Sequence, residues 1–125
     1  MRIVIVALLG VLAGCTSSQK LTAPWVGAGT GPSAGLNRAY AACQAAYERS
    51  TNPTRTNRAK CLTAAENRFA SDFPDREYLR QQQGLRMSLA QRVDSGEITQ
   101  AVADATYARE MSRIKAASEA RRAAG

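Results

Sequence analysis

Histidine is absent from this chain of 125 residues, and aromatic side chains are scarce. Without an imidazole, the chain lacks the side chain most often used for acid–base catalysis near neutral pH and the commonest ligand of metal ions. It also lacks the Gly-x-Ser-x-Gly elbow of many hydrolases and any phosphate-binding loop. Its closest acidic cluster, Asp72, Asp75 and Glu77, lies where a helix is expected to begin, and helix capping accounts for it. We therefore expect no enzymatic activity, no cofactor and no metal site.

A run of apolar residues long enough to cross a bilayer is also missing. The longest apolar stretch, residues 3–14, falls short of the roughly 20 residues that a membrane span needs. It follows Met1 and Arg2, and it ends in Leu12-Ala13-Gly14-Cys15. A basic residue, a short apolar segment and small residues before a cleavage point are typical of a secretory signal peptide. An ordinary secretory signal and a buried N-terminal helix are two interpretations of this segment.

A third interpretation is more specific, because Leu12-Ala13-Gly14-Cys15 resembles the lipobox of bacterial lipoproteins. The resemblance implies that residues 1–14 are a signal peptide and that Cys15 becomes a lipidated N-terminus with a diacylglyceryl group and an N-acyl chain. Two or more acyl chains anchor a protein durably, at roughly 0.8 kcal/mol per buried CH₂. Thr16 follows the cysteine, where Asp favours inner-membrane retention in Gram-negative lipoproteins. The resemblance therefore implies a lipid anchor in the outer membrane, facing the periplasm.

Only three cysteines occur, and the lipobox uses one of them. The remaining two, Cys43 and Cys61, form an even pair in an exported chain, which predicts a disulfide. Both lie nine residues from Asn52, beside Pro53, so they would be level in an antiparallel helical hairpin that turns there. A metal site and a redox-active pair are the alternatives. The lack of histidine and of Cys-x-x-Cys disfavours both.

Composition divides the chain into three parts. Residues 1–14 are the expected signal peptide, and residues 15–35 the lipid-anchored cysteine with a tether rich in Gly, Pro and Ser. Residues 36–123 are the expected helical domain. The only tryptophan, Trp25, lies in the tether, where its ring could rest on lipid headgroups or on the domain. It is also a candidate anchor for a partner, because Trp is enriched in binding hot spots.

Four amphipathic helices are predicted in the domain, over residues 36–49, 58–70, 74–93 and 100–123. In the first, Leu36, Tyr40, Cys43 and Tyr47 follow a 4-3-4 spacing that forms one apolar stripe. Asp72 or Asp75 can cap the third helix, Gly96 suits the left-handed turn after it, and Thr99 can cap the fourth. The pattern predicts an all-α fold, a short antiparallel bundle of three to four helices with one disulfide.

Residues 43–122 also resemble small helical lipoproteins of alphaproteobacteria that have no assigned activity. The shared features are the cysteine pair, Pro74-Asp75, and the pattern Leu-x-x-x-Val-Asp-x-Gly-x-Ile-Thr from Leu89 to Thr99. The resemblance implies a helical fold and a location in the cell envelope, and it implies no activity.

Basic residues outnumber acidic ones by 17 to 10, so the chain favours anionic partners. Arg55, Arg58 and Lys60 make the turn after the first predicted helix the most basic corner, either as a solvated loop or as an anion site. An exported protein does not meet nucleic acid, so we expect no nucleic-acid partner. Lipopolysaccharide phosphates, anionic lipids and acidic protein surfaces are the available targets.

These observations favour an accessory or assembly lipoprotein that binds another envelope protein through Trp25, Arg55, Arg58 and Lys60. A pilotin-like escort of a secretin subunit is one version, by analogy of architecture. The alternative is an envelope-structural lipoprotein that binds lipopolysaccharide or peptidoglycan through an arginine-rich surface. A ligand-binding or inhibitor role in the periplasm would need a preformed apolar pocket, and the small alanine-rich core disfavours a large one. The sequence specifies neither the partner nor the oligomeric state.

Overall fold

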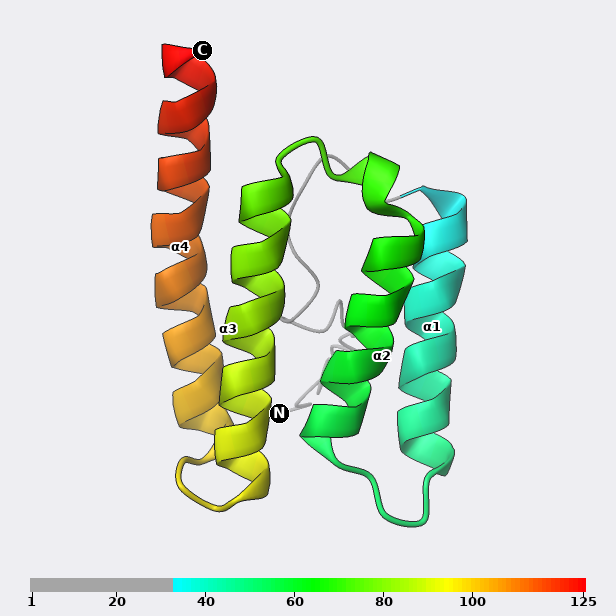
Figure 1. Cartoon of the computed structure of the whole chain (residues 1–125). Coiled ribbons are helices and arrows are strands. Elements are labelled where there is room, and N and C mark those ends of the chain that lie inside the picture. The colour runs from blue at the N-terminus through cyan, green and yellow to red at the C-terminus, as the bar shows by residue number, and fades with distance from the viewer. Residues whose placement is uncertain (1–32) are drawn as a thin grey trace, which may run out of the picture.

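The computed structural model describes residues 33–125, which form four α-helices and one short 3-10 helix without any strand (Figure 1). The helices are α1 (Ala34–Arg49), α2 (Arg55–Arg68), α3 (Arg76–Asp94) and α4 (Gln100–Ala124), and η1 (Ala70–Asp72) follows α2. The predicted all-α fold with antiparallel helices is confirmed. Among the described residues, no helix combines the length and apolar character needed to cross a membrane. Cys15, Trp25, the expected signal peptide and almost all of the expected tether lie outside the described residues.

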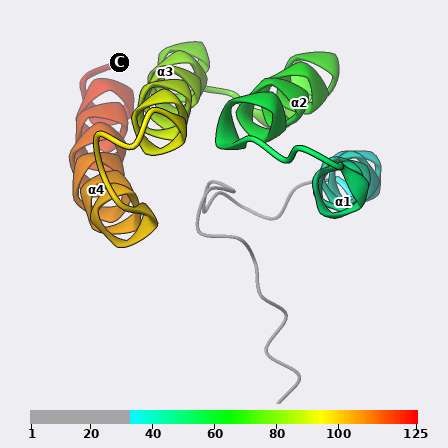
Figure 2. The same ribbon diagram turned by 90° about the horizontal axis from the view of Figure 1, so that it is seen from below.

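The four helices form a single curved layer in which each helix packs mainly against its neighbours in sequence. Viewed end-on, the layer is an arc with α1 and α4 at its two ends (Figure 2). One apolar cluster joins α1 to α2 around Leu36, Cys43 and Leu62. Another joins α3 to α4 around Leu89 and Tyr107. The arc therefore has a concave side that all four helices border.

Each α-helix is preceded by a residue whose side chain accepts a hydrogen bond from a backbone N–H of the first turn, and this supplies an acceptor for one of the donors that a helix start leaves unpaired. Asp75 accepts from Tyr78 N at 2.9 Å, and Thr99 accepts from Val102 N at 3.2 Å, as the sequence predicted. Gly96 has a φ of 76°, which confirms the predicted left-handed turn before α4. Local chemistry thus determines where α3 and α4 begin.

The second helix begins at Arg55, three residues before the predicted start at residue 58. Thr54 caps it by accepting from Asn57 N at 3.1 Å. The carboxylate of Asp94, at the end of α3, also accepts from the backbone N–H groups of Arg55 and Thr56, at 2.9 and 2.8 Å. This contact joins residues far apart in the sequence, so the local pattern could not predict it.

The predicted disulfide is confirmed. Cys43 of α1 and Cys61 of α2 are bonded, with their Cα atoms 5.7 Å apart. The bond fixes the two helices beside the apolar cluster that contains Leu36 and Leu62. It therefore reinforces one end of the arc.

Replacing both Cys43 and Cys61 with Ala should lower the free energy of unfolding by roughly 3 kcal/mol, because the closed loop restricts the unfolded chain. Urea denaturation followed by circular dichroism measures this loss. Reductant should produce the same loss in the wild-type protein and have no effect on the double variant. Equal unfolding midpoints for oxidised and reduced wild type would contradict the prediction.

Two helical glycines allow opposite predictions for the same substitution. Around Gly84, in the continuous helix α3, an added Cβ would meet no atom within 4 Å, so Gly84→Ala should stabilise the protein by roughly 0.5–1 kcal/mol. At Gly35 the added Cβ would lie 2.5 Å from Cε1 of Phe69, so Gly35→Ala should destabilise it. Thermal melting compares the two variants. If Gly35→Ala raised the melting temperature, the close approach of α1 to Phe69 would be wrong, and if Gly84→Ala lowered it, the open space around Gly84 would be wrong.

Candidate functional site

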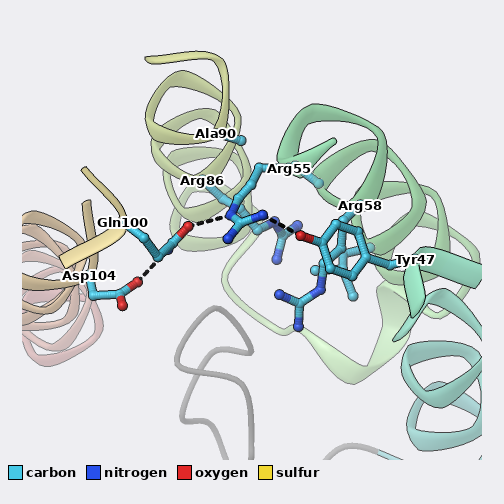
Figure 3. A pocket seen from close by; sticks show the side chains of 9 residues that line it. Tyr47, Arg55, Arg58, Arg86, Ala90, Gln100 and Asp104 are labelled. Atoms are coloured by element: carbon cyan, nitrogen blue, oxygen red, sulfur yellow. Dashed lines mark hydrogen bonds between the residues drawn. The ribbon is translucent and has the colours of Figure 1, made fainter. Parts of the chain in front are cut away.

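A cavity of about 240 Å³ lies on the concave side of the arc, and all four helices line it (Figure 3). We call it the arginine pocket. Three arginines and a tyrosine form its polar walls, small apolar residues form its floor, and two polar residues of α4 border it. The lining residues are Tyr47, Arg55, Arg58, Ala59, Leu62, Arg86, Ala90, Gln100 and Asp104.

Arg55 crosses the pocket and connects the two ends of the arc. Its NH1 donates a hydrogen bond to the hydroxyl of Tyr47 on α1, and its Nε donates to Oε1 of Gln100 on α4 (Figure 3). Nε2 of Gln100 in turn donates to Oδ1 of Asp104 at 2.7 Å. A continuous chain of side-chain hydrogen bonds therefore spans the pocket from α1 to α4. Arg55 can serve both helices because it stands at the first position of α2.

Arg58 lies one turn further along α2, against the same tyrosine. The guanidinium carbons of Arg55 and Arg58 are 5.7 and 5.6 Å from the centroid of the Tyr47 ring, within the range of cation–π attraction. Burial lowers the pKa of Arg58 below its ordinary value, and the charges of Arg55 and Arg86 act in the same direction. The Nε atom of Arg58 is buried and has no hydrogen-bond partner among the described residues.

Arg86 lies at the base of the pocket in a buried ion pair with Glu66 of α2. Its NH1 donates to Oε1 at 2.8 Å and its NH2 to Oε2 at 2.6 Å, so the pair is bidentate. The hydroxyl of Tyr40, on α1, donates to the same Oε1 at 3.0 Å. Burial, followed by the charge of Glu66, raises the pKa of this Tyr40 hydroxyl above its ordinary value. The carboxylate neutralises Arg86, so Asp104 is the one carboxylate among the lining residues that remains to offset Arg55 and Arg58, and the exposed Glu48 also acts on Arg58.

The pocket therefore carries an excess positive charge above an apolar floor. Ala59, Leu62 and Ala90 supply that floor, and each is no more than 3% exposed. Such a site attracts an anion and can bury a small apolar group attached to it. Within residues 33–125, no group of three or more Cys, Asp or Glu side chains could hold a metal ion.

Two of the predicted partner-binding residues, Arg55 and Arg58, come together in this pocket. The third basic residue, Lys60, is exposed and does not line it. Trp25 and the lipidation candidate Cys15 lie outside the described residues, so the structure does not bear on them.

Sequence reasoning missed Arg86 and Glu66. A signal for them existed, because each lies on an apolar helix face. Glu66 follows Leu62 by four residues, and Arg86 precedes Leu89 by three. Opposite charges on the facing stripes of successive helices predict a buried pair. Tyr47 was assigned to the apolar stripe, whereas its ring and hydroxyl hold the two pocket arginines.

Comparisons with protein-family models, with curated proteins and with solved structures find no match for this chain. The interpretation of the pocket therefore depends on its own geometry.

Replacing Glu66 with Gln should lower the free energy of unfolding by about 3–5 kcal/mol, because it removes the carboxylate that neutralises a buried guanidinium. Glu66 is 0% exposed and Arg86 is 1% exposed, so water cannot take over that role without local opening. The matched control is Glu48→Gln on the exposed surface of α1, which should change stability by less than about 0.5 kcal/mol. Urea unfolding of both variants tests the difference, and equal effects would refute a structural role for the pair.

Proposed function

We propose that this protein is a lipid-anchored accessory protein of the cell envelope that binds another envelope protein on the concave side of its helical arc. The observation that carries the proposal is the arginine pocket, to which every helix of the arc contributes. In a closed four-helix bundle, this side would be buried by the helices themselves. Here α1 and α4 stand at opposite ends of the arc, which supports a role for the concave side in binding (Figure 2).

Charge complementarity supports an acidic segment as the part of the partner that binds. The pocket has an excess of positive charge, and partly buried charges are screened less by salt than exposed ones. Arginine is also enriched in protein interfaces, where its guanidinium pairs with carboxylates in a bidentate manner. Membrane attachment would come from Cys15, through the lipobox-like sequence before it.

The alternative, an envelope-structural lipoprotein, would use the exposed arginines more generally to bind lipopolysaccharide or peptidoglycan. Several of the exposed cations on α4 already have acidic partners. Arg109 and Arg113 share Glu110, at 3.4 and 2.9 Å, and Arg121 lies 3.0 Å from Asp75. These pairs reduce the net charge that a diffuse surface interaction would use, which favours the pocket as the binding site.

Site-specific photo-crosslinking in cells tests the proposal. A photoreactive amino acid at Ala108, exposed one turn beyond Asp104 on α4, should crosslink one envelope protein, and mass spectrometry should place the adduct in an acidic segment. The matched control is Ala64, which is also exposed but lies half a turn away from the pocket residues of α2. The Ala64 position should yield no such adduct, and Cys15→Ser should abolish the adduct formed at Ala108.

Two results would contradict the proposal. Equal crosslinking from Ala64 and Ala108 would mean that the concave side is not the binding surface. Adducts confined to abundant porins, lipopolysaccharide or peptidoglycan fragments would support the envelope-structural alternative instead.

A further inference from the structure

The three pocket arginines differ in the acceptors that their guanidinium groups meet. Arg86 is engaged by Glu66, and Arg55 by Tyr47 and Gln100. Arg58 stacks on Tyr47, but its buried Nε has no hydrogen-bond partner among the described residues. A buried donor without an acceptor is costly, and a guanidinium presents several donors in a fork that fits a carboxylate. Because Arg86 already pairs with a carboxylate and Arg55 with two neutral acceptors, Arg58 is the residue of the pocket best prepared to receive an anion.

The surrounding charges favour an anion with a single negative charge. Arg55 and Arg58 supply two positive charges, Asp104 supplies one negative charge, and Glu66 neutralises Arg86. Counted over the lining residues and Glu66, the pocket has an excess of one positive charge, and the exposed carboxylate of Glu48, which also acts on Arg58, lies outside this count. A carboxylate, with one negative charge, balances this excess, whereas a dianion would leave the pocket with a net negative charge. Burial, above all, lowers the pKa of Arg58, while Tyr47 and Glu48 act in the opposite direction, and an anion placed against the guanidinium would favour its charged form.

The volume and the apolar floor of the pocket indicate the chemical character of the rest of the ligand, beside its charged group. A cavity of about 150 Å³ holds a benzene ring, so the arginine pocket, at about 240 Å³, holds more than a bare carboxylate or a phosphate ion. Leu62 and Ala90 present an apolar surface that an ion alone would leave uncovered. A ligand with a few aliphatic carbons beside its carboxylate would cover this floor and place its charge against Arg58.

Resting on the proposed function, we infer that the arginine pocket recognises an aliphatic carboxylate of the partner protein, with Arg58 as the residue that binds it. Two parts of a polypeptide carry this chemistry. One is a chain end with an apolar last residue, and the other is a glutamate side chain with its two methylene groups. The same pocket accommodates either, and small model compounds distinguish them.

The experiment titrates the full-length chain, purified in detergent micelles with ¹⁵N-labelled arginine, and follows the Nε–H signals by NMR. The probes are N-acetylleucine for a chain end and N-acetylglutamic acid α-amide for a side chain. Their neutral counterparts are N-acetylleucinamide and N-acetylglutamine amide, and inorganic phosphate is the competing anion. At least one carboxylate should shift the Arg58 signal saturably, and the one that binds more tightly identifies the source. The neutral compounds should leave the signal unchanged.

Arg58→Gln should weaken the binding of that carboxylate by about tenfold or more, since hydrogen bonds to charged groups contribute roughly 1.5–3 kcal/mol. For this variant, binding is followed through the signals of the other pocket arginines. Arg68→Gln is the matched control, because Arg68 is an exposed arginine at the other end of the same helix. It should leave the affinity unchanged within about twofold.

A gain of affinity separates recognition from misfolding. Asp104→Asn removes the negative charge at the border of the pocket and keeps an oxygen that can accept from Gln100. Carboxylate binding should then strengthen by about threefold, because one like charge is removed from the lining of the same pocket in a largely aqueous setting. A damaged fold would not produce that result.

The inference is overturned if the neutral compounds shift the Arg58 signal as strongly as the carboxylates, or if phosphate binds more tightly than both carboxylates. It is also overturned if no probe shifts the signal. These results are independent of the crosslinking at Ala108. Carboxylate binding without a crosslinked partner would refute the proposed function alone, and a crosslinked partner without carboxylate binding would refute this inference alone.

Discussion

The arrangement of the two halves of the molecule depends on the buried ion pair between Glu66 and Arg86. One apolar cluster belongs to α1 and α2, the other to α3 and α4, and they share no residue. Between them lie Glu66, Arg86 and Gln82, three polar side chains that are at most 1% exposed. An ion pair in such a place gains little net stability, because desolvation offsets most of its attraction. Its geometry is specific, however, and a bidentate contact fixes how α3 sits on α2.

Carboxylates at the helix ends stabilise an arc whose helices contact few neighbours. Asp72 accepts from the backbone N–H of Ser33 at 3.1 Å, and Asp94 accepts from the start of α2. Asp75 accepts from the hydroxyl of Ser118 and from Arg121, so it connects the start of α3 to the last turns of α4. The hydrogen bond from Ser118, followed by the bond from the backbone of Tyr78, holds the pKa of Asp75 well below its usual value. For Asp94, burial raises the pKa, but hydrogen bonds from Thr56 and the Arg55 backbone outweigh burial.

The sequence predicts contacts between residues that are close along the chain, and it does not predict contacts between residues that are far apart along it. Thr99, Asp75 and Gly96 act on their own helix ends, and the cysteine pair lies across one turn, so local pattern predicts all of them. The start of α2 was predicted too late because the local cap at Thr54 was missed and because Asp94, which also accepts from the first backbone N–H groups, lies 39 residues from Arg55. That error separated Arg55 from the helix and grouped it with Lys60. On a helix that starts at residue 55, Lys60 points away from Arg55 and Arg58, as the structure shows.

The arginine pocket is the site at which the side chains contribute least to the stability of the fold. Three guanidinium groups close together oppose folding, and a cluster with a purely structural role would give each of them an acceptor. Arg86 has a carboxylate, and Arg55 has a hydroxyl and an amide oxygen. Arg58 has an aromatic face but no acceptor for its buried Nε among the described residues. Positions that violate a stability rule without local compensation are expected at functional sites, because their requirement is met by something outside the chain. Among the described residues, Arg86 meets a carboxylate and Arg55 two neutral acceptors, whereas Arg58 meets an aromatic ring, and this difference is what best distinguishes a binding pocket from a gap in the packing of the helices.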